Sequence, residues 1–229
     1  MSDSVENTKA PKDPLFSKKN KKLVTDPLMD NNPITVQVLG ICSALAITVQ
    51  VEQGVVMGLS VAFVLMAGNV IISLLRNLIP SRIRIIVQLV VVASLVIIVD
   101  QLLAAFMPDV SEKLSVFVGL IITNCIIMGR FEAFAMANKP WPSLIDAVGN
   151  SIGYAWILIL VAVVRELFGS GSLYGYQIFG SAIPGEEWGL YTMGYVNNNL
   201  MILPPMALII VGIIIWIQRM KNKDLIESH

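Results

Sequence analysis

The sequence predicts an all-α integral membrane protein with six transmembrane segments, arranged as an inverted repeat of three plus three. The class rests on composition, because 55% of the 229 residues are hydrophobic and only 14% are charged. The arrangement rests on the two cysteines, which stand in two unusually short apolar segments at matching places in the two halves of the chain. Such a pair of segments indicates a site near the middle of the bilayer.

Four apolar runs are near or above the roughly 18 residues that suggest a spanning helix. They cover residues 54–75, 83–107, 144–167 and 200–217. The two remaining segments, 34–49 and 114–129, have 16 residues each. As helices they reach only about 24 Å, short of a hydrocarbon core of roughly 30 Å. We therefore expect the first and fourth segments to be short half-helices.

The polar ends of the chain predict its orientation. Residues 1–33 are rich in Lys, Asp, Asn and Pro, which is typical of a disordered tail. If all six segments cross, fourteen lysines and arginines lie on one side, and only Lys113 and Arg165 lie on the other. The positive-inside rule then places the tail and the C-terminal residues 218–229 in the cytoplasm. Residues 34–217 remain as a membrane domain in contact with lipid.

The membrane domain divides into halves, 34–107 and 114–217. Each half has a short cysteine segment, then a long helix, then a third helix. The second helices end alike, LLRNLI at 74–79 against VVRELF at 163–168. Three crossings per half would give the halves opposite orientations, which also explains why Arg165 stands on the outer side as the counterpart of Arg76. The alternative is that any two hydrophobic triplets look alike.

Three interpretations of Cys42 and Cys125 remain open from the residues alone. Both could be small apolar core residues, they could form a disulfide, or they could bind a metal. Thiolates are costly at low dielectric unless a cation neutralises them. Two cysteines cannot complete a four-thiolate site, and the one histidine is the last residue, His229. A cluster would therefore require two more sulfurs from another chain.

Two carboxylates inside predicted spans are candidates for Na⁺ passage, because an ionisable residue in a span indicates function by default. These are Asp100, late in the third segment, and Asp146, at the start of the fifth. Their alternative roles are an interfacial residue for Asp100 and a helix cap for Asp146. Arg130 and Glu132 follow the second short segment and are expected to form an interfacial ion pair or a subunit contact.

Several longer stretches carry a resemblance to a known family. They are DNNP at 30–33, VLGICSALA at 38–46, RIIVQ at 84–88, VDQ at 99–101, SVFVGLIITNC at 115–125, MGRFEAFAM at 128–136 and RELFGSG at 165–171. Over about residues 27–220 the chain resembles the D subunit of the Na⁺-translocating NADH:quinone reductases.

The resemblance implies that this subunit pairs with a homologous, oppositely oriented E subunit. The two share a [2Fe–2S] cluster within the membrane, with Cys42 and Cys125 as the ligands from this chain. It also implies bacterial inner-membrane localisation and a six-subunit complex that includes the A, B, C and F subunits. NADH, FAD and FMN are bound by other subunits, and electrons pass from a cytoplasmic flavoprotein toward a periplasmic FMN subunit and ubiquinone, coupled to Na⁺ export.

Two rival functions stand beside this one. The E subunit of an Rnf-type ferredoxin:NAD⁺ reductase shares the fold and the cysteines, but typically has Pro after the first Cys, where this chain has Ser43. A cluster-free transporter or scaffold subunit is the second rival. The sequence has no phosphate-cradling Gly-rich motif, no Ser/His/Asp arrangement and no nucleic-acid patch, so no complete active site or nucleic-acid partner is expected on this chain.

Overall fold

The computed structural model describes residues 18–28, 31–80, 82–106, 119–174, 176–177 and 199–221. The regular elements of these residues are helices, apart from one short antiparallel pair, β1 (Ser172–Leu173) with β2 (Tyr176–Gln177). The predicted helical membrane class is confirmed. Our expectations for residues 1–17 and 222–229, and for the start of the fourth segment at 114–118, lie outside the described residues.

Within the described ranges, four helices are long and apolar enough to cross a bilayer: α3 (Val51–Leu75), α4 (Arg84–Phe106), α7 (Pro140–Ser170) and α8 (Pro204–Lys221). They correspond to the four predicted apolar runs. Helix α7 begins before its apolar run, because proline fits the first positions of a helix, where its missing N–H leaves no bond unmade. Their length and composition make the chain a multi-pass membrane protein.

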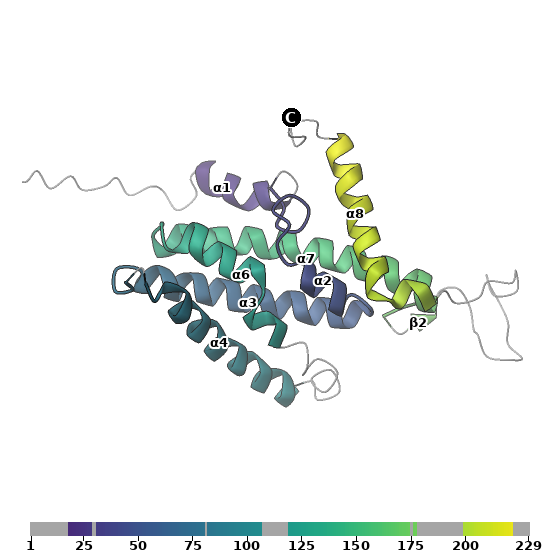
Figure 1. Cartoon of the computed structure of the whole chain (residues 1–229), viewed down its shortest axis with the longest axis horizontal. Helices are drawn as coiled ribbons and strands as arrows, with labels where there is room; N and C mark the ends of the chain where they lie inside the picture. The colour runs from purple at the N-terminus through teal and green to yellow at the C-terminus, as the bar shows by residue number, and fades with distance from the viewer. Residues whose placement is uncertain are drawn as a thin grey trace, which may run out of the picture.

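Helices α3 and α7 lie side by side at the centre of the molecule (Figure 1). A methyl group built on Gly58 of α3 would lie 3.2 Å from Cβ of Ala155, so the two backbones approach closely. Further along α3, the Asn69 amide donates to the carbonyl of Ser143 at 3.0 Å. Because higher numbers in α3 meet lower numbers in α7, the two helices are antiparallel.

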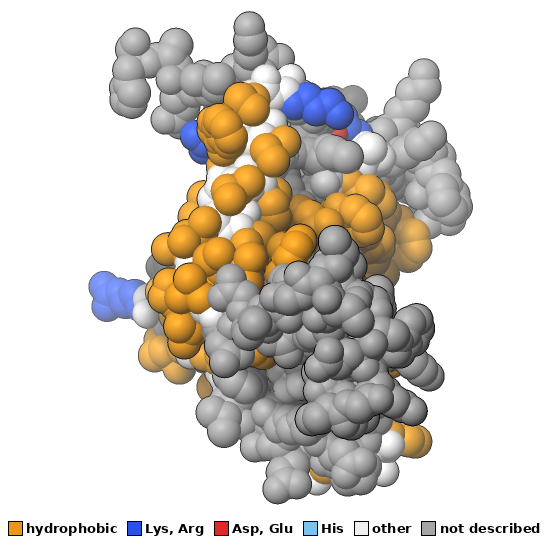
Figure 2. All heavy atoms as spheres, turned by 90° about the vertical axis from the view of Figure 1, so that its right-hand side faces the viewer, with side chains coloured by type: hydrophobic (Ala, Val, Ile, Leu, Met, Phe, Trp, Pro, Cys, Tyr) orange, Lys and Arg blue, Asp and Glu red, His pale blue; other side chains and the backbone are white. Residues whose placement is uncertain are grey.

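Helices α4 and α8 lie at the periphery. In Figure 1, α4 packs beside α3 while α8 rises away from the central pair. Large apolar side chains such as Ile97 of α4 and Trp216 of α8 are more than half exposed. Figure 2 shows a broad band of hydrophobic side chains on the side of the molecule where α8 lies. Such faces suit lipid or partner helices rather than water.

Both short segments are broken rather than continuous helices. In the first, residues 31–40 form turns, and only α2 (Ile41–Ile47) is helical, so its half-helix is shorter than predicted. In the second, helical residues 119–122 are interrupted at Thr123 and Asn124 before α6 (Cys125–Arg130) and the π-helix η2 (Phe131–Ala135). The sequence did not predict the position of either break, and the six-segment arrangement stays a prediction.

The N-terminal segment packs against α7. Helix α1 (Lys18–Thr25) and the 3₁₀ turn η1 (Asp26–Leu28) lie over two glycines of α7. A Cβ at Gly149 would lie 2.6 Å from the Leu23 carbonyl oxygen, and one at Gly153 would lie 2.3 Å from that of Pro27. Over residues 18–28 the expected disordered tail is thus wrong, because these glycines open a groove in which backbone can lie against backbone.

Candidate functional site

The two helix breaks meet in the interior of the protein. Gly40, the residue before α2, has a φ of 81°, a left-handed conformation that favours glycine. Asn124, the residue before α6, caps that helix by accepting from the Ile126 N–H at 3.4 Å. A Cβ at Gly40 would lie only 3.5 Å from Oδ1 of Asn124. The starts of the two short helices are therefore adjacent, although they are far apart in the sequence.

This meeting brings the two cysteines together. Cys42 is the second residue of α2, and Cys125 is the first residue of α6. Both are free thiols exposed at the surface of the chain, and the Cys125 side chain is close enough to the Cys42 thiol to interact with it electrostatically. The two residues that the sequence singled out thus form one pair, presented outward.

Behind the thiols, a hydroxyl network links α2 to α7. Ser43 donates to the Gly40 carbonyl at 2.7 Å, and its Oγ lies 2.7 Å from the hydroxyl of Tyr154. Both side chains are completely buried. The residue next to Cys42 is therefore held by the central helix rather than by lipid.

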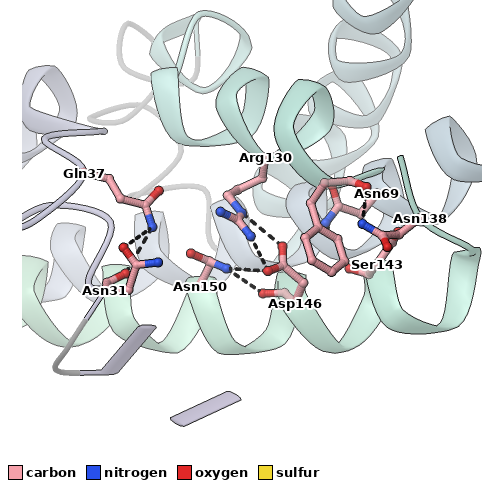
Figure 3. Close-up of polar contacts among 9 residues, drawn as sticks. Asn31, Gln37, Asn69, Arg130, Asn138, Ser143, Asp146 and Asn150 are labelled. Carbon is pink, nitrogen blue, oxygen red and sulfur yellow. Dashed lines mark hydrogen bonds and ion pairs between the residues drawn. The ribbon is translucent and has the colours of Figure 1, made fainter. Parts of the chain in front are cut away.

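The far end of α6 is anchored by a buried ion pair. Arg130 donates through Nε to Oδ2 of Asp146 at 3.0 Å and through Nη2 to Oδ1, a two-point contact (Figure 3). The Arg130 side chain is 14% exposed and that of Asp146 is 2% exposed. The Asn150 amide donates to the same carboxylate at 3.1 Å. The guanidinium also lies 5.5 Å from the centre of the Phe134 ring.

The far end of α2 is anchored by a second arginine. Arg165 of α7 is buried and donates to the Leu45 carbonyl at 3.3 Å and to Oγ1 of Thr48 at 2.6 Å. It also donates to the Met201 carbonyl at 3.1 Å, in the 3₁₀ turn η4 (Asn199–Ile202). Next to it, Glu166 accepts from the Val51 N–H at 2.6 Å, at the start of α3.

The structure revises several of our expectations for the charged residues. Asp146 lies in the second turn of α7, not at its first residue, so it is no helix cap. Arg130 and Glu132 do not pair with each other; Glu132 instead pairs with Arg84 at the surface. Asp100 is partly exposed near the end of α4, and neither ion pair found in the described residues includes it. A role for Asp100 or Asp146 in Na⁺ passage stays a prediction.

The donor set fits half of a four-thiolate centre. Two thiols converge at the surface, where a second chain could reach them. Among the residues that the structure describes, no group of three or more His, Cys, Asp or Glu side chains is placed to hold a metal ion. A four-thiolate site built on Cys42 and Cys125 needs two sulfurs from another chain, because the sequence has two cysteines.

Sequence reasoning missed Tyr154 and the partner of Arg130. A signal for both was present, since Asp146, Asn150 and Tyr154 recur at every fourth position of an apolar helix. Residues four apart lie on the same helix face, and polar groups in a span face the protein interior. The spacing of Asp146, Asn150 and Tyr154 therefore predicts a polar face of α7 that is turned toward the protein interior.

Together, these features define a multi-pass helical membrane protein with a pair of neighbouring, exposed thiols. The family model described as "Rnf-Nqr subunit, membrane protein" matches residues 20–215, and the chain belongs to this family.

The resemblance to the D subunit is confirmed by curated relatives. The chain is 54% identical over 207 residues to the D subunit of the Na(+)-translocating NADH-quinone reductase of Psychromonas ingrahamii, covering 90% of this chain and 95% of that protein. It is 50% identical over 212 residues to proteins of the same name from Photobacterium profundum and a Shewanella species. Those two alignments each cover 93% of this chain and 98% of the relative.

Proposed function

We propose that this chain is the D subunit of a Na⁺-translocating NADH:ubiquinone reductase in a bacterial inner membrane. It holds half of an intramembrane [2Fe–2S] cluster through Cys42 and Cys125, and the homologous E subunit supplies the other two thiolates. When bound, the cluster accepts and releases single electrons between the cytoplasmic flavoprotein and the periplasmic FMN subunit. The A, B, C and F subunits complete the assembly, with NADH, FAD and FMN bound outside this chain.

One observation carries the proposal: the thiols of Cys42 and Cys125 adjoin each other and are exposed, although they come from different short helices. A pair of core cysteines would be buried, and a structural disulfide would have no need of exposure. An exposed thiol pair inside a membrane protein instead suits a metal shared with another chain, because the metal neutralises the thiolate charge.

The chain's own residues prepare this site before any partner arrives. Gly40 supplies the left-handed turn that starts α2, and Asn124 caps α6. Arg165 and Arg130 hold the opposite ends of the two short helices. The sulfurs are thus carried by two anchored helices, which favours a fixed separation between the ligands.

An inverted repeat of three plus three segments is part of the proposal, with both termini in the cytoplasm. Its support is that the equivalent arginines make equivalent contacts. Arg165 donates to the end of α2, while Arg76 donates to the Ala137 carbonyl just after η2 at 3.4 Å. Each second helix therefore reaches the end of the short segment in the other half, as a two-fold relation in the membrane plane requires.

Na⁺ passage past Asp100 and Asp146 is the remaining part of the proposal. Asp100 is partly exposed on the peripheral helix α4, beside exposed apolar side chains such as Ile97 and Ile98. Asp146 accepts from Arg130 and Asn150, so an approaching cation would compete with a guanidinium. Replacing Asp100 by Asn should therefore weaken the Na⁺ stimulation of quinone reduction, with Ser94→Ala on an exposed face of the same helix as the control.

The decisive experiment is iron analysis and electron paramagnetic resonance of the purified complex. Cys42→Ser and Cys125→Ser should each remove the iron and the signal of one [2Fe–2S] centre while leaving the centre of the flavoprotein in place. Gly212→Ala, at a position where a methyl group meets no atom within 4 Å, is the matched control. Full iron content in both cysteine variants would end the proposal in favour of a cluster-free scaffold.

The Rnf-type alternative is tested by the electron donor. A complex of the NADH:quinone type reduces ubiquinone with NADH, whereas the rival couples ferredoxin to NAD⁺. The hydroxyl of Ser43 bonds to Gly40 and Tyr154, contacts that a proline at this position could not make. This favours the NADH:quinone branch.

A further inference from the structure

Tyr154 lies directly behind the two thiol-bearing breaks. It is fully buried in the middle of α7, and its ring fills the space over Gly40. A methyl group on Gly40 would lie 2.9 Å from Cε2 of this ring. The left-handed turn before Cys42 is therefore backed by a rigid aromatic wall that leaves no room for a side chain.

The direction of the hydroxyl network follows from counting protons. Ser43 has one O–H, and it donates that proton to the Gly40 carbonyl. The 2.7 Å contact between Ser43 and Tyr154 must then use the phenolic proton, so Tyr154 donates and the serine oxygen accepts. The two hydrogen bonds therefore point the same way: Tyr154 of α7 donates to Ser43, and Ser43 donates to Gly40 in the turn before Cys42.

The same phenol is next to the second break. The side chain of Asn124 is a neighbour of Tyr154, since both reach the space over Gly40, and its Nδ2 is buried with no hydrogen-bond partner. The phenolic oxygen still has a lone pair to accept this amide. Asn124 in turn caps the helix that begins with Cys125. One hydroxyl therefore adjoins the residue after Cys42 and the residue before Cys125.

We propose that Tyr154 is the positioning residue of the thiol pair: its hydroxyl fixes the two breaks relative to each other and sets the polarity behind the sulfurs. This inference rests on the proposed function, because the group that the thiols hold is the [2Fe–2S] cluster. Outer groups that orient metal ligands commonly change metal affinity by roughly 10–100-fold when removed. Polar groups near cluster sulfurs also raise the reduction potential, since the reduced state carries more negative charge.

The test uses Tyr154→Phe in the purified complete complex, with Tyr174→Phe as the control. Tyr174 also loses one hydroxyl, but it is exposed in the turn beyond α7. Tyr154→Phe should keep the cluster but lose its iron to a chelator roughly tenfold faster. Its midpoint potential should become more negative and its resonance line shape should change, while Tyr174→Phe matches the wild type in all three measurements.

Ser43→Ala provides the second variant, because it removes the other hydroxyl of the same bond. Ser43→Ala should also make the midpoint potential of the cluster more negative. If the Tyr154→Phe complex fails to assemble, the Ser43→Ala result tests the positioning role instead. Unchanged potential, line shape and iron loss in both variants would overturn the inference while leaving the proposed function intact. Absence of this cluster from the wild-type complex would instead overturn the proposed function.

Discussion

The two arginine–carboxylate pairs around α6 make a matched experiment on burial. Asp146→Asn keeps the shape of the side chain but removes its charge, which leaves Arg130 in the interior without a counter-ion. Glu132→Gln does the same to the pair with Arg84, whose side chains are 48% and 32% exposed. The first pair is 2% and 14% exposed, so the two variants differ mainly in access to solvent.

The magnitudes follow from that difference. Breaking a buried, hydrogen-bonded pair by removing one partner costs about 3–5 kcal/mol, because an uncompensated charge stays buried. Breaking an exposed pair costs about 0–1 kcal/mol, because water solvates the remaining charge. For a chain of this size, 1 kcal/mol corresponds to roughly 2–4 °C in midpoint temperature. Asp146→Asn should therefore lower the midpoint by about 6–20 °C, and Glu132→Gln by at most about 4 °C.

The measurement is a thermal challenge of the purified complex, with this chain followed in the soluble fraction by immunodetection. The double variant Arg130→Gln with Asp146→Asn should recover part of the loss, because it removes the stranded charge. Equal midpoints for Asp146→Asn and Glu132→Gln would refute the claim that burial gives the pair at α6 its strength.

Three further predictions test other contacts. Gly153→Ala should destabilise the protein by about 1–3 kcal/mol in the same assay, because its methyl group would lie 2.3 Å from the Pro27 carbonyl oxygen, whereas Gly212→Ala should stabilise it slightly. In cluster-depleted protein, a mild oxidant should join Cys42 and Cys125 within one chain, and a mass spectrum with only free thiols would contradict their adjacency. Arg165→Lys should lower the midpoint temperature by several degrees, because a lysine cannot bond the carbonyls of both Leu45 in α2 and Met201 in η4 as the guanidinium does. An unchanged midpoint temperature would argue that these bonds do not hold the two segments together.

The long helices could be predicted because their signal is local. Apolar runs above about 18 residues predict spans whatever the rest of the chain does. The predicted and observed spans differ only at their ends: α7, for example, begins at Pro140, before its apolar run. The positions of Cys42 and Cys125 in short segments were equally local, and the structure brings these two thiols together.

The breaks and their supports depend on contacts between distant parts of the chain. Gly40 permits a left-handed turn, but the sequence did not show that the ring of Tyr154 occupies the space where a side chain at this position would lie. For Arg130 the sequence left an ion pair with Glu132 and a subunit contact open, and the pairing with Asp146 depends on how α6 and α7 pack. The composition of residues 1–33 predicted disorder, yet Leu23 and Pro27 pack against glycines that lie 126 residues further along the chain.

At both broken segments an asparagine side chain accepts hydrogen bonds from backbone N–H groups. Asn32 accepts from the N–H groups of Ile34 and Thr35 at 3.0 and 3.3 Å and donates to the Gly153 carbonyl at 3.0 Å. Asn124 caps α6 in the second segment. Non-helical backbone is tolerated at membrane depth only where protein satisfies its polar groups. In this chain the two asparagines bond backbone N–H groups at both breaks, so these bonds do not depend on a second protein. The exposed thiols of Cys42 and Cys125 are then free to bind the shared centre that we propose.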